Sequence, residues 1–236
     1  SIDKNTTIVG DKAVVSIALL NASNRVLSIN AVVTVKVNGA NYTVGLSNGR
    51  GTFTLSDLTE GIYIINAVFA GDDKYNQSTS NRVELNVTKV RTALAINATA
   101  TVIAVGDDAV FNITLNETID TTVVLRVNGT EYNVAVVNGV GNFTIAHLAK
   151  GTYYINATFA GDDKYVGSES NTVELNVTKV PTALTVNVTA AVIVVGDDAL
   201  INITLNETID TTVVLRVNGT EYNVAVVNGV GNFTIA

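Results

Sequence analysis

The chain has 236 residues, of which 47% are hydrophobic, so it has enough apolar material for packed cores. Only 15% of its residues carry a charge and its net charge is -7, which argues against nucleic-acid or anionic-membrane partners, because both require a basic patch. Cysteine is absent, which excludes disulfides, thiolate metal sites and a cysteine nucleophile. No apolar run approaches the ~18 residues of a membrane helix, so no membrane insertion is expected within this segment. We expect any signal peptide to have been removed or to lie upstream.

A repeat of 90 residues organises the chain. GDDKY occurs at residues 71–75 and again at 161–165, and residues 202–236 are identical to residues 112–146. We therefore expect three domains: 1–89, which lacks most of its first strand, 90–179, which is complete, and 180–236, which lacks its last two strands. Such a third domain would expose an unpaired sheet edge and half of its core. We expect the polypeptide to continue past residue 236, or a second chain to supply the missing strands.

In the second copy, apolar and polar residues alternate with a period of two, which predicts half-buried strands. In chain order, these strands are expected at residues 94–98, 111–115, 143–145, 153–159 and 173–177. Asn-Gly pairs at 128–129 and 138–139 predict tight hairpin turns that need positive φ. With about seven strands per repeat and no helical periodicity, the predicted fold is all-β: tandem immunoglobulin-like β-sandwich domains in an extended array.

Two further features belong to this fold. The motif Leu-x-x-Gly-x-Tyr, which ends at Tyr63 and again at Tyr153, has the spacing of a tyrosine corner, so both tyrosines are assigned a structural role. The linkers are short, and Pro181 fixes its own φ and restricts Val180. A semi-rigid connection between neighbouring domains is therefore expected.

The stretch 137–165, with the motifs VNG, LxxGxY and FAGDxxY, resembles the group 3 bacterial-type Ig-like repeat. The Asn- and Thr-rich, Cys-free character of all three copies looks like the adhesin-like cell-surface proteins of methanogenic archaea. The resemblance implies an immunoglobulin-like fold and a spacer role, and it provides no catalytic residues to carry over.

The strongest chemical signal is Asn-x-Ser/Thr, the acceptor sequence for N-glycosylation. It occurs seventeen times, whereas chance pairing would give about five. The alternative is that Asn and Thr two residues apart simply share an exposed strand face. The acceptors in strands fall opposite the apolar alternation, so we expect several to carry glycans, which implies secretion. The seventeen are Asn5, Asn21, Asn41, Asn76, Asn86, Asn97, Asn112, Asn116, Asn128, Asn142, Asn156, Asn176, Asn187, Asn202, Asn206, Asn218 and Asn232.

Paired acids between strands are the second signal. Asp107 and Asp108, together with Glu207 and Asp210 of the next domain, are weak candidates for calcium at a domain junction, because loop carboxylates supply oxygen ligands. The competing explanation is that Gly-Asp is turn chemistry, in which the Asp side chain bonds nearby backbone amides. Lys89, Lys179 and Arg91 at the junctions could also neutralise these acids. No other metal site and no organic cofactor are expected.

Catalysis has little support in the sequence. His147 is the only histidine and its counterpart in the first copy is Asp57, so no Ser–His or Cys–His pair is available. Nothing places two acids across a cleft, as a glycosidase requires. The lysines of the second copy lie in loops and at the linker, which argues against a buried Lys–Asn isopeptide crosslink. We expect the protein not to be an enzyme.

Three functions remain open. The first is an extracellular, N-glycosylated stalk or adhesin-like repeat region that projects a binding domain from the cell surface. The second is a structural subunit of an extracellular filament or surface layer, with repeats completed between chains. The third is a carbohydrate-binding module, although aromatic residues make up only 6% of the chain. The expected partners are neighbouring repeats of the same chain or neighbouring copies in a filament.

Overall fold

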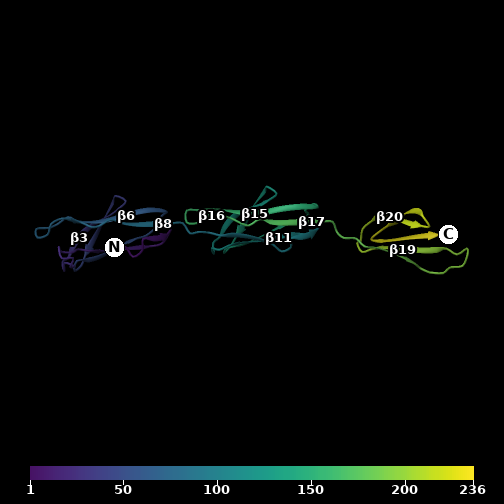
Figure 1. Cartoon of the computed structure of the whole chain (residues 1–236), viewed down its shortest axis with the longest axis horizontal. Coiled ribbons are helices and arrows are strands. Elements are labelled where there is room, and N and C mark those ends of the chain that lie inside the picture. The colour runs from purple at the N-terminus through teal and green to yellow at the C-terminus, as the bar shows by residue number, and fades with distance from the viewer. The chain divides into compact units, whose positions relative to one another are not determined.

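The computed structural model describes all residues from Ser1 to Ala236 and contains β-strands but no helix. The strands form two compact units, Ser1–Val177 and Thr178–Ala236. The first unit holds two separate clusters of buried apolar side chains and the second holds one. These clusters fall in residues 1–89, 90–179 and 180–236, which we call repeat 1, repeat 2 and repeat 3. Figure 1 shows the strands of each repeat.

Repeat 2 consists of two sheets packed around one core. One sheet has the strand order β14-β11-β9, and the other has the order β10-β17-β15-β12-β13, with β16 paired to β15. This arrangement, with the first two long strands on one sheet and the last two on the other, is that of an immunoglobulin-like sandwich. It confirms the predicted all-β fold. The strands are β9 Leu94–Ala98, β10 Val102–Ala104, β11 Ala109–Leu115, β12 Thr121–Val127, β13 Thr130–Val136, β14 Val140–Ile145, β15 Gly151–Gly161, β16 Val166–Glu169 and β17 Val173–Thr178.

The core of repeat 2 follows from the alternation of apolar residues. Phe111 on β11 meets Ile155 on β15 and Leu175 on β17 in one cluster, and each of the three side chains is 0% exposed. The strands predicted at 111–115, 153–159 and 173–177 therefore turn their apolar faces toward one interior, as their alternation indicates. Because successive side chains of a strand point to opposite faces, the same alternation places the intervening Asn and Thr residues outside.

The two Asn-Gly turns of repeat 2 have the geometry that their sequence predicts. Asn128 and Gly129 have φ of 47° and 89°, and they join β12 to β13. Asn138 and Gly139 have φ of 50° and 80°, between β13 and β14. Two successive residues with positive φ define the type I′ turn, which matches the twist of the flanking strands.

Repeat 1 has the same plan without a complete first strand. Ser1 and Asp3 pair with β2, in the place that the end of β9 takes in repeat 2. β1 pairs with β8 in parallel, and β10 pairs with β17 at the same place in repeat 2, where the bond from Asn176 N to Thr101 O matches that from Asn86 N to Asn5 O. Its strands are β1 Thr6–Ile8, β2 Ala13–Ala18, β3 Ala31–Val37, β4 Ala40–Leu46, β5 Arg50–Leu55, β6 Gly61–Phe69, β7 Ser78–Thr79 and β8 Val83–Thr88.

Residues 180–236 of repeat 3 contain the counterparts of β9 and of β11 to β14. Within these residues no strand lies over β18, so Leu184 and Val186 are 48% and 51% exposed, whereas the equivalent residues of β9 are almost completely buried. The sheets are reduced to β18-β19-β22 and β20-β21. The strands are β18 Leu184–Val188, β19 Ala199–Leu205, β20 Thr211–Val217, β21 Thr220–Val226 and β22 Val230–Ile235.

Candidate glycosylated faces and the repeat junction

Three acceptor asparagines form a row across the outer face of one sheet of repeat 2. Asn112 on β11 is paired directly with Asn97 on β9 and with Asn142 on β14. All three are exposed, because their strand neighbours on either side point into the core. Repeat 3 has the same row, formed by Asn187, Asn202 and Asn232. Directly opposed residues of a sheet lie about 5 Å apart, so three acceptor side chains crowd a small area.

The second sheet of repeat 2 also carries acceptors. Asn156 lies on β15 opposite Arg126 of β12 and is half-buried, and Asn176 lies on β17 opposite Thr152 and is exposed. Across the whole chain, fifteen of the seventeen acceptors are exposed, the exceptions are Asn156 and Asn202, and none is buried. Attachment of a sugar at any acceptor therefore requires no group to enter a core.

The acceptor side chains differ in the hydrogen bonds that they make within the protein. The amide of Asn116 accepts a hydrogen bond from Ala93 N (2.7 Å) and donates to Arg91 O (3.4 Å) and to the carboxylate of Glu117 (3.3 Å). Asn128 accepts from Tyr154 N (2.8 Å) and donates to the backbone of strand β15. A glycan replaces one hydrogen of the same nitrogen, so these loop acceptors lose structural bonds on modification, whereas those of the Asn112 row do not.

The tyrosines of the Leu-x-x-Gly-x-Tyr motifs bond to the loop that precedes them. The hydroxyl of Tyr153 donates to Ala149 O (3.0 Å). In repeat 1, the hydroxyl of Tyr63 donates to Thr59 O (3.2 Å) and accepts from Thr59 N (3.1 Å). Each bond ties the start of a strand in the second sheet to the crossover from the first sheet, as a tyrosine corner does.

The linker between repeats 1 and 2 is hydrogen-bonded along its length to the hairpin between β15 and β16. Val90 N donates to Lys164 O (2.8 Å), and Val166 N donates to Val90 O (2.8 Å). The ammonium of Lys89 donates to Asp162 O (2.6 Å), and the hydroxyl of Thr92 donates to Val166 O (2.6 Å). We call this set of bonds the linker clasp. Lys89 was considered above only as a neutraliser of the junction acids, whereas its ammonium bonds a carbonyl, and nothing in the local sequence pattern predicts the clasp.

Both Gly-Asp-Asp-Lys-Tyr segments form turns, and the turn at residues 161–165 provides the clasp. One carboxylate oxygen of Asp162 accepts from Lys164 N (2.8 Å) and Tyr165 N (2.7 Å), and Asp72 accepts the equivalent bonds in repeat 1. Gly161 begins the turn with φ of 78°. This is the turn chemistry expected of Asp, in which the side chain bonds the backbone two residues on.

The four calcium candidates lie in loops of separate units, and three of them are bonded there. Asp107 accepts from Ala104 N (3.0 Å), Glu207 accepts from the amide of Asn206 (3.1 Å), and Asp210 accepts from Asn228 N (2.7 Å). Asp108 is exposed. Within either unit, no group of three or more His, Cys, Asp or Glu side chains is placed to hold one metal ion.

Asp11, the counterpart of Asp107 in repeat 1, accepts hydrogen bonds from two side chains. Its carboxylate accepts from the hydroxyl of Thr7 (2.7 Å) and from the ammonium of Lys4 (3.2 Å). The hydrogen bond from Thr7, followed by that from Lys4, lowers the pKa of Asp11 below its ordinary value. This first loop is therefore built to keep its carboxylate charged as part of the turn.

His147 occupies a position with left-handed backbone. Its φ is 58°, and its counterpart Asp57 has φ of 55°. His, Asp and Asn are the non-glycine residues enriched in this conformation, so the backbone requirement explains why this loop position alternates between the two. The side chain is exposed.

The structure contains no helix that could span a membrane.

No known protein family and no curated protein matches the sequence. Solved structures do resemble it. The titin domains z1z2 in complex with telethonin are 17% identical, with 77% of this chain and 97% of that chain covered and a TM-score of 0.43. The fibronectin(III)-like modules of CbhA from Clostridium thermocellum are 14% identical, with 76% and 94% covered and a TM-score of 0.34. An I-band fragment of titin is 13% identical over 98% of this chain and 84% of its own, with a TM-score of 0.39.

Proposed function

We propose that this chain is a non-catalytic, N-glycosylated repeat region of an extracellular surface protein, which acts as a stalk or adhesin-like spacer of the kind that its sequence resembles in methanogenic archaea. The observation that carries the proposal is the position of the acceptors. They lie on the outer faces of both sheets of repeat 2, and no acceptor in the chain is buried. A domain coated on both broad faces has little bare surface for lateral recognition, which favours a spacer.

The linker clasp supports the same role. A stalk must keep successive domains from folding back on one another, and backbone bonds from both sides of Val90 restrict the linker between repeats 1 and 2. The equivalent linker before repeat 3 contains Pro181, whose ring restricts the backbone in a different way. With strands of ~8 residues at ~3.3 Å each plus loops, each domain adds on the order of 35–45 Å to such a stalk.

Intact mass spectrometry of native material tests the glycosylation. We expect a mass above the 24.7 kDa of this segment, with glycans on Asn97, Asn112 and Asn142 and lower occupancy on Asn116. Treatment with a glycosidase should remove the excess. Asn133, an exposed strand asparagine outside any acceptor sequence, serves as the internal control and should stay unmodified. Unmodified asparagine at all seventeen acceptors would remove the support for secretion and for this function.

The second candidate is a structural subunit of an extracellular filament or surface layer, in which sandwich repeats are completed by strands of a neighbouring copy. Single-molecule electron microscopy over a range of concentrations separates the two candidates. The stalk predicts isolated beaded rods at every concentration, whereas the filament predicts end-to-end assemblies that lengthen as the concentration rises. Filaments that persist on dilution would overturn the stalk.

A further inference from the structure

Strands β4 and β5 form one side of the sandwich of repeat 1, and β13 and β14 form the same side of repeat 2. The two strands of each pair are joined by a tight turn, where the backbone of Ser47 bonds that of Arg50 and the backbone of Val137 bonds that of Val140. The strands then diverge, and each becomes the last strand of a different sheet. Each of the four therefore has one side without a neighbouring strand, which we call its open edge.

The backbone groups at the open edge can be assigned from the bonds at the turns. In an antiparallel strand, the backbone groups of successive residues point alternately to the two sides. In β4, Ser47 bonds β5 on the side away from β3, so the N–H and C=O groups of Asn41 and Thr43 point to that side as well. The same alternation in β14 places the groups of Asn142 and Thr144 on the side away from β11.

The acceptor sequences of β4 and β14 coincide with these groups. In residues 41–43 (Asn-Tyr-Thr) and 142–144 (Asn-Phe-Thr), the Asn and the Thr both have their backbone groups at the open edge and exposed side chains. The aromatic residue between them packs against the other strand of the pair. The ring centroids of Tyr42 and Phe53 are 4.9 Å apart, and those of the equivalent rings in repeat 2 are 5.0 Å apart. The acceptor sequence is thus placed on the edge by the residue that closes the sandwich.

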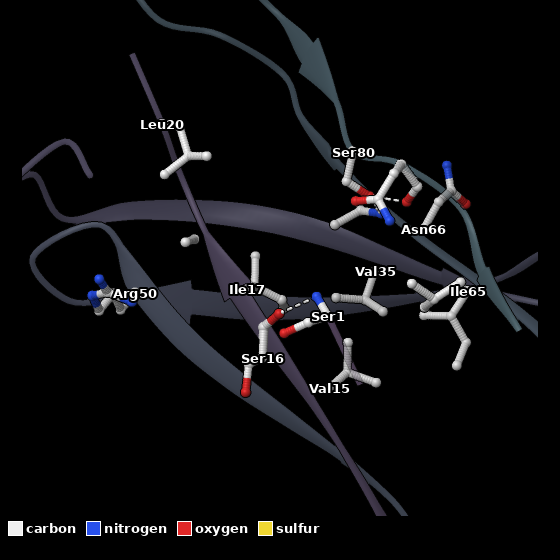
Figure 2. A pocket seen from close by; sticks show the side chains of 14 residues that line it. Ser1, Val15, Ser16, Ile17, Leu20, Val35, Arg50, Ile65, Asn66 and Ser80 are labelled. Carbon is white, nitrogen blue, oxygen red and sulfur yellow. Dashed lines mark hydrogen bonds between the residues drawn. The ribbon is translucent and has the colours of Figure 1, made fainter. Parts of the chain in front are cut away.

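The other two strands of these pairs carry a charge in place of an acceptor. β13 has Glu131 at the position of Asn41, and β5 has Arg50 at the position of Val140. Neither β13 nor β5 contains an acceptor asparagine, and neither β4 nor β14 contains a charged residue. Figure 2 shows the exposed Arg50 apart from Ile65 of the core. Repeats 1 and 2 therefore each have one charged edge and one edge with an acceptor, on opposite strands of the pair.

An open edge without a charge fits a second copy of itself. Proteins block open edges with charges, with Pro or by covering them, because unpaired backbone groups are a template for another strand. In an antiparallel pair of two β4 strands centred on Tyr42, Asn41 of one copy faces Thr43 of the other, and their open N–H and C=O groups bond in both directions. A partner edge with Glu131 or Arg50 would bring an unpaired charge into this ladder. The same strand of a second copy is therefore the partner that the bare edge of β4 fits.

We propose that glycans on Asn41 and Asn142 prevent β4 and β14 from pairing with the same strands of a second copy, as the charges of Glu131 and Arg50 do for the other two edges. This inference rests on the glycosylation proposed above. A glycan on Asn41 begins at a side chain of the open edge itself, so it occupies the space that an incoming strand needs. Without glycans, β4 pairs with β4 of a second copy.

The test uses the 236-residue chain produced in a host without N-glycosylation. We expect it to associate in sedimentation velocity as its concentration rises, and the amides of Asn41 and Thr43 to become protected from hydrogen exchange over the same range. Residues 40–46 occur only once in the sequence, so their peptide reports on β4 alone. Residues 50–55, which carry the charge of Arg50, should gain no protection.

Three variants of the unglycosylated chain test the role of charge. Asn41→Glu copies the residue of β13 and should weaken association through β4 about 10-fold or more, because each copy then brings a carboxylate into the same short ladder. Asn41→Gln is its matched control, since it also removes the acceptor but adds no charge, and it should associate as the unchanged chain does. Arg50→Val copies the residue of β14 and should give residues 50–55 the protection that they otherwise lack.

The glycosylated chain separates this inference from the proposed function. There Thr43→Ala removes the acceptor sequence and keeps Asn41, so it should produce the protection of residues 40–46 that the glycosylated parent lacks. Glycans on Asn41 without concentration-dependent protection of β4 in the unglycosylated chain would overturn the inference and leave the proposed function in place. Unmodified Asn41 and Asn142 beside glycans at other acceptors would also overturn it. So would equal protection in Asn41→Glu and the unchanged chain, or protection confined to repeat 3.

Discussion

Replacing Phe111 with alanine is expected to destabilise repeat 2 by about 3–5 kcal/mol, the usual cost of removing a fully buried aromatic ring from a core. Phe111 is 0% exposed and lies in the middle of β11, between the two sheets. Repeats 1 and 3 have cores of their own, so their stability should change little. Hydrogen exchange followed by mass spectrometry measures this for each repeat. Repeats 2 and 3 are told apart by peptides from residues 90–111, 147–179 and 180–201, because residues 112–146 and 202–236 are identical.

Thr114→Ser, which keeps the acceptor sequence of Asn112, is the matched control for this substitution. Thr114 lies on the same strand but on its exposed face, where a change of side chain alters strand stability by about 1 kcal/mol or less. If Phe111→Ala destabilised repeat 1 as much as repeat 2, the two cores would be energetically coupled. The description of separate sandwiches joined by a linker would then be wrong.

Gly161→Ala is expected to have the second largest effect, because it adds a clash to an unfavourable backbone conformation. Gly161 has φ of +78°, and a Cβ there would lie 2.5 Å from Gly167 N and 2.7 Å from Tyr165 O. The left-handed conformation costs a residue with a side chain about 1–3 kcal/mol, and overpacking costs about 1–3 kcal/mol more. The hairpin that holds the linker should open locally, so the amides of Val90 and Val166 should exchange faster.

Gly129→Ala separates the two contributions. Gly129 has nearly the same backbone conformation, with φ of +89°, but a Cβ there meets nothing within 4 Å. Its substitution should therefore cost only the conformational part and leave the linker amides protected. Equal destabilisation by the two substitutions, or protection of Val90 that survives in Gly161→Ala, would contradict the role given to this hairpin.

Much of the fold could be predicted from the local alternation of apolar and polar residues. The strands that this pattern did not predict lack the alternation for identifiable reasons. The pattern of residues 111–115 was sufficient to place β11, because inner and outer residues differ in polarity at every step. It was not sufficient for β12, where Val124 lies on the outer face among inward Val123 and Leu125, so apolar residues run together. The short strand β16 was also missed, because none of its residues Val166–Glu169 is buried and no apolar alternation marks it.

The candidate site was also predictable only in part. The outward direction of Asn112 follows from a period of two and needs no knowledge of the rest of the chain. The bonds that distinguish Asn116 from Asn112 join residues 23 positions apart, and the bond between Thr92 and Val166 joins residues 74 apart. Pairings of that span depend on how the sheets close around the core, which local periodicity does not encode.

The parallel pairing at the edge of each complete sheet has a mechanical consequence. In repeat 1, β1 runs beside β8 with Thr6 opposite Asn86 and Ile8 opposite Thr88, and in repeat 2, β10 runs beside β17 in the same way. These strands lie near the opposite chain ends of each repeat, so a force that pulls the ends apart slides them along one another. All the bonds between them must then stretch together in shear instead of parting one at a time. Repeats 1 and 2 are thereby built to resist tension along the chain.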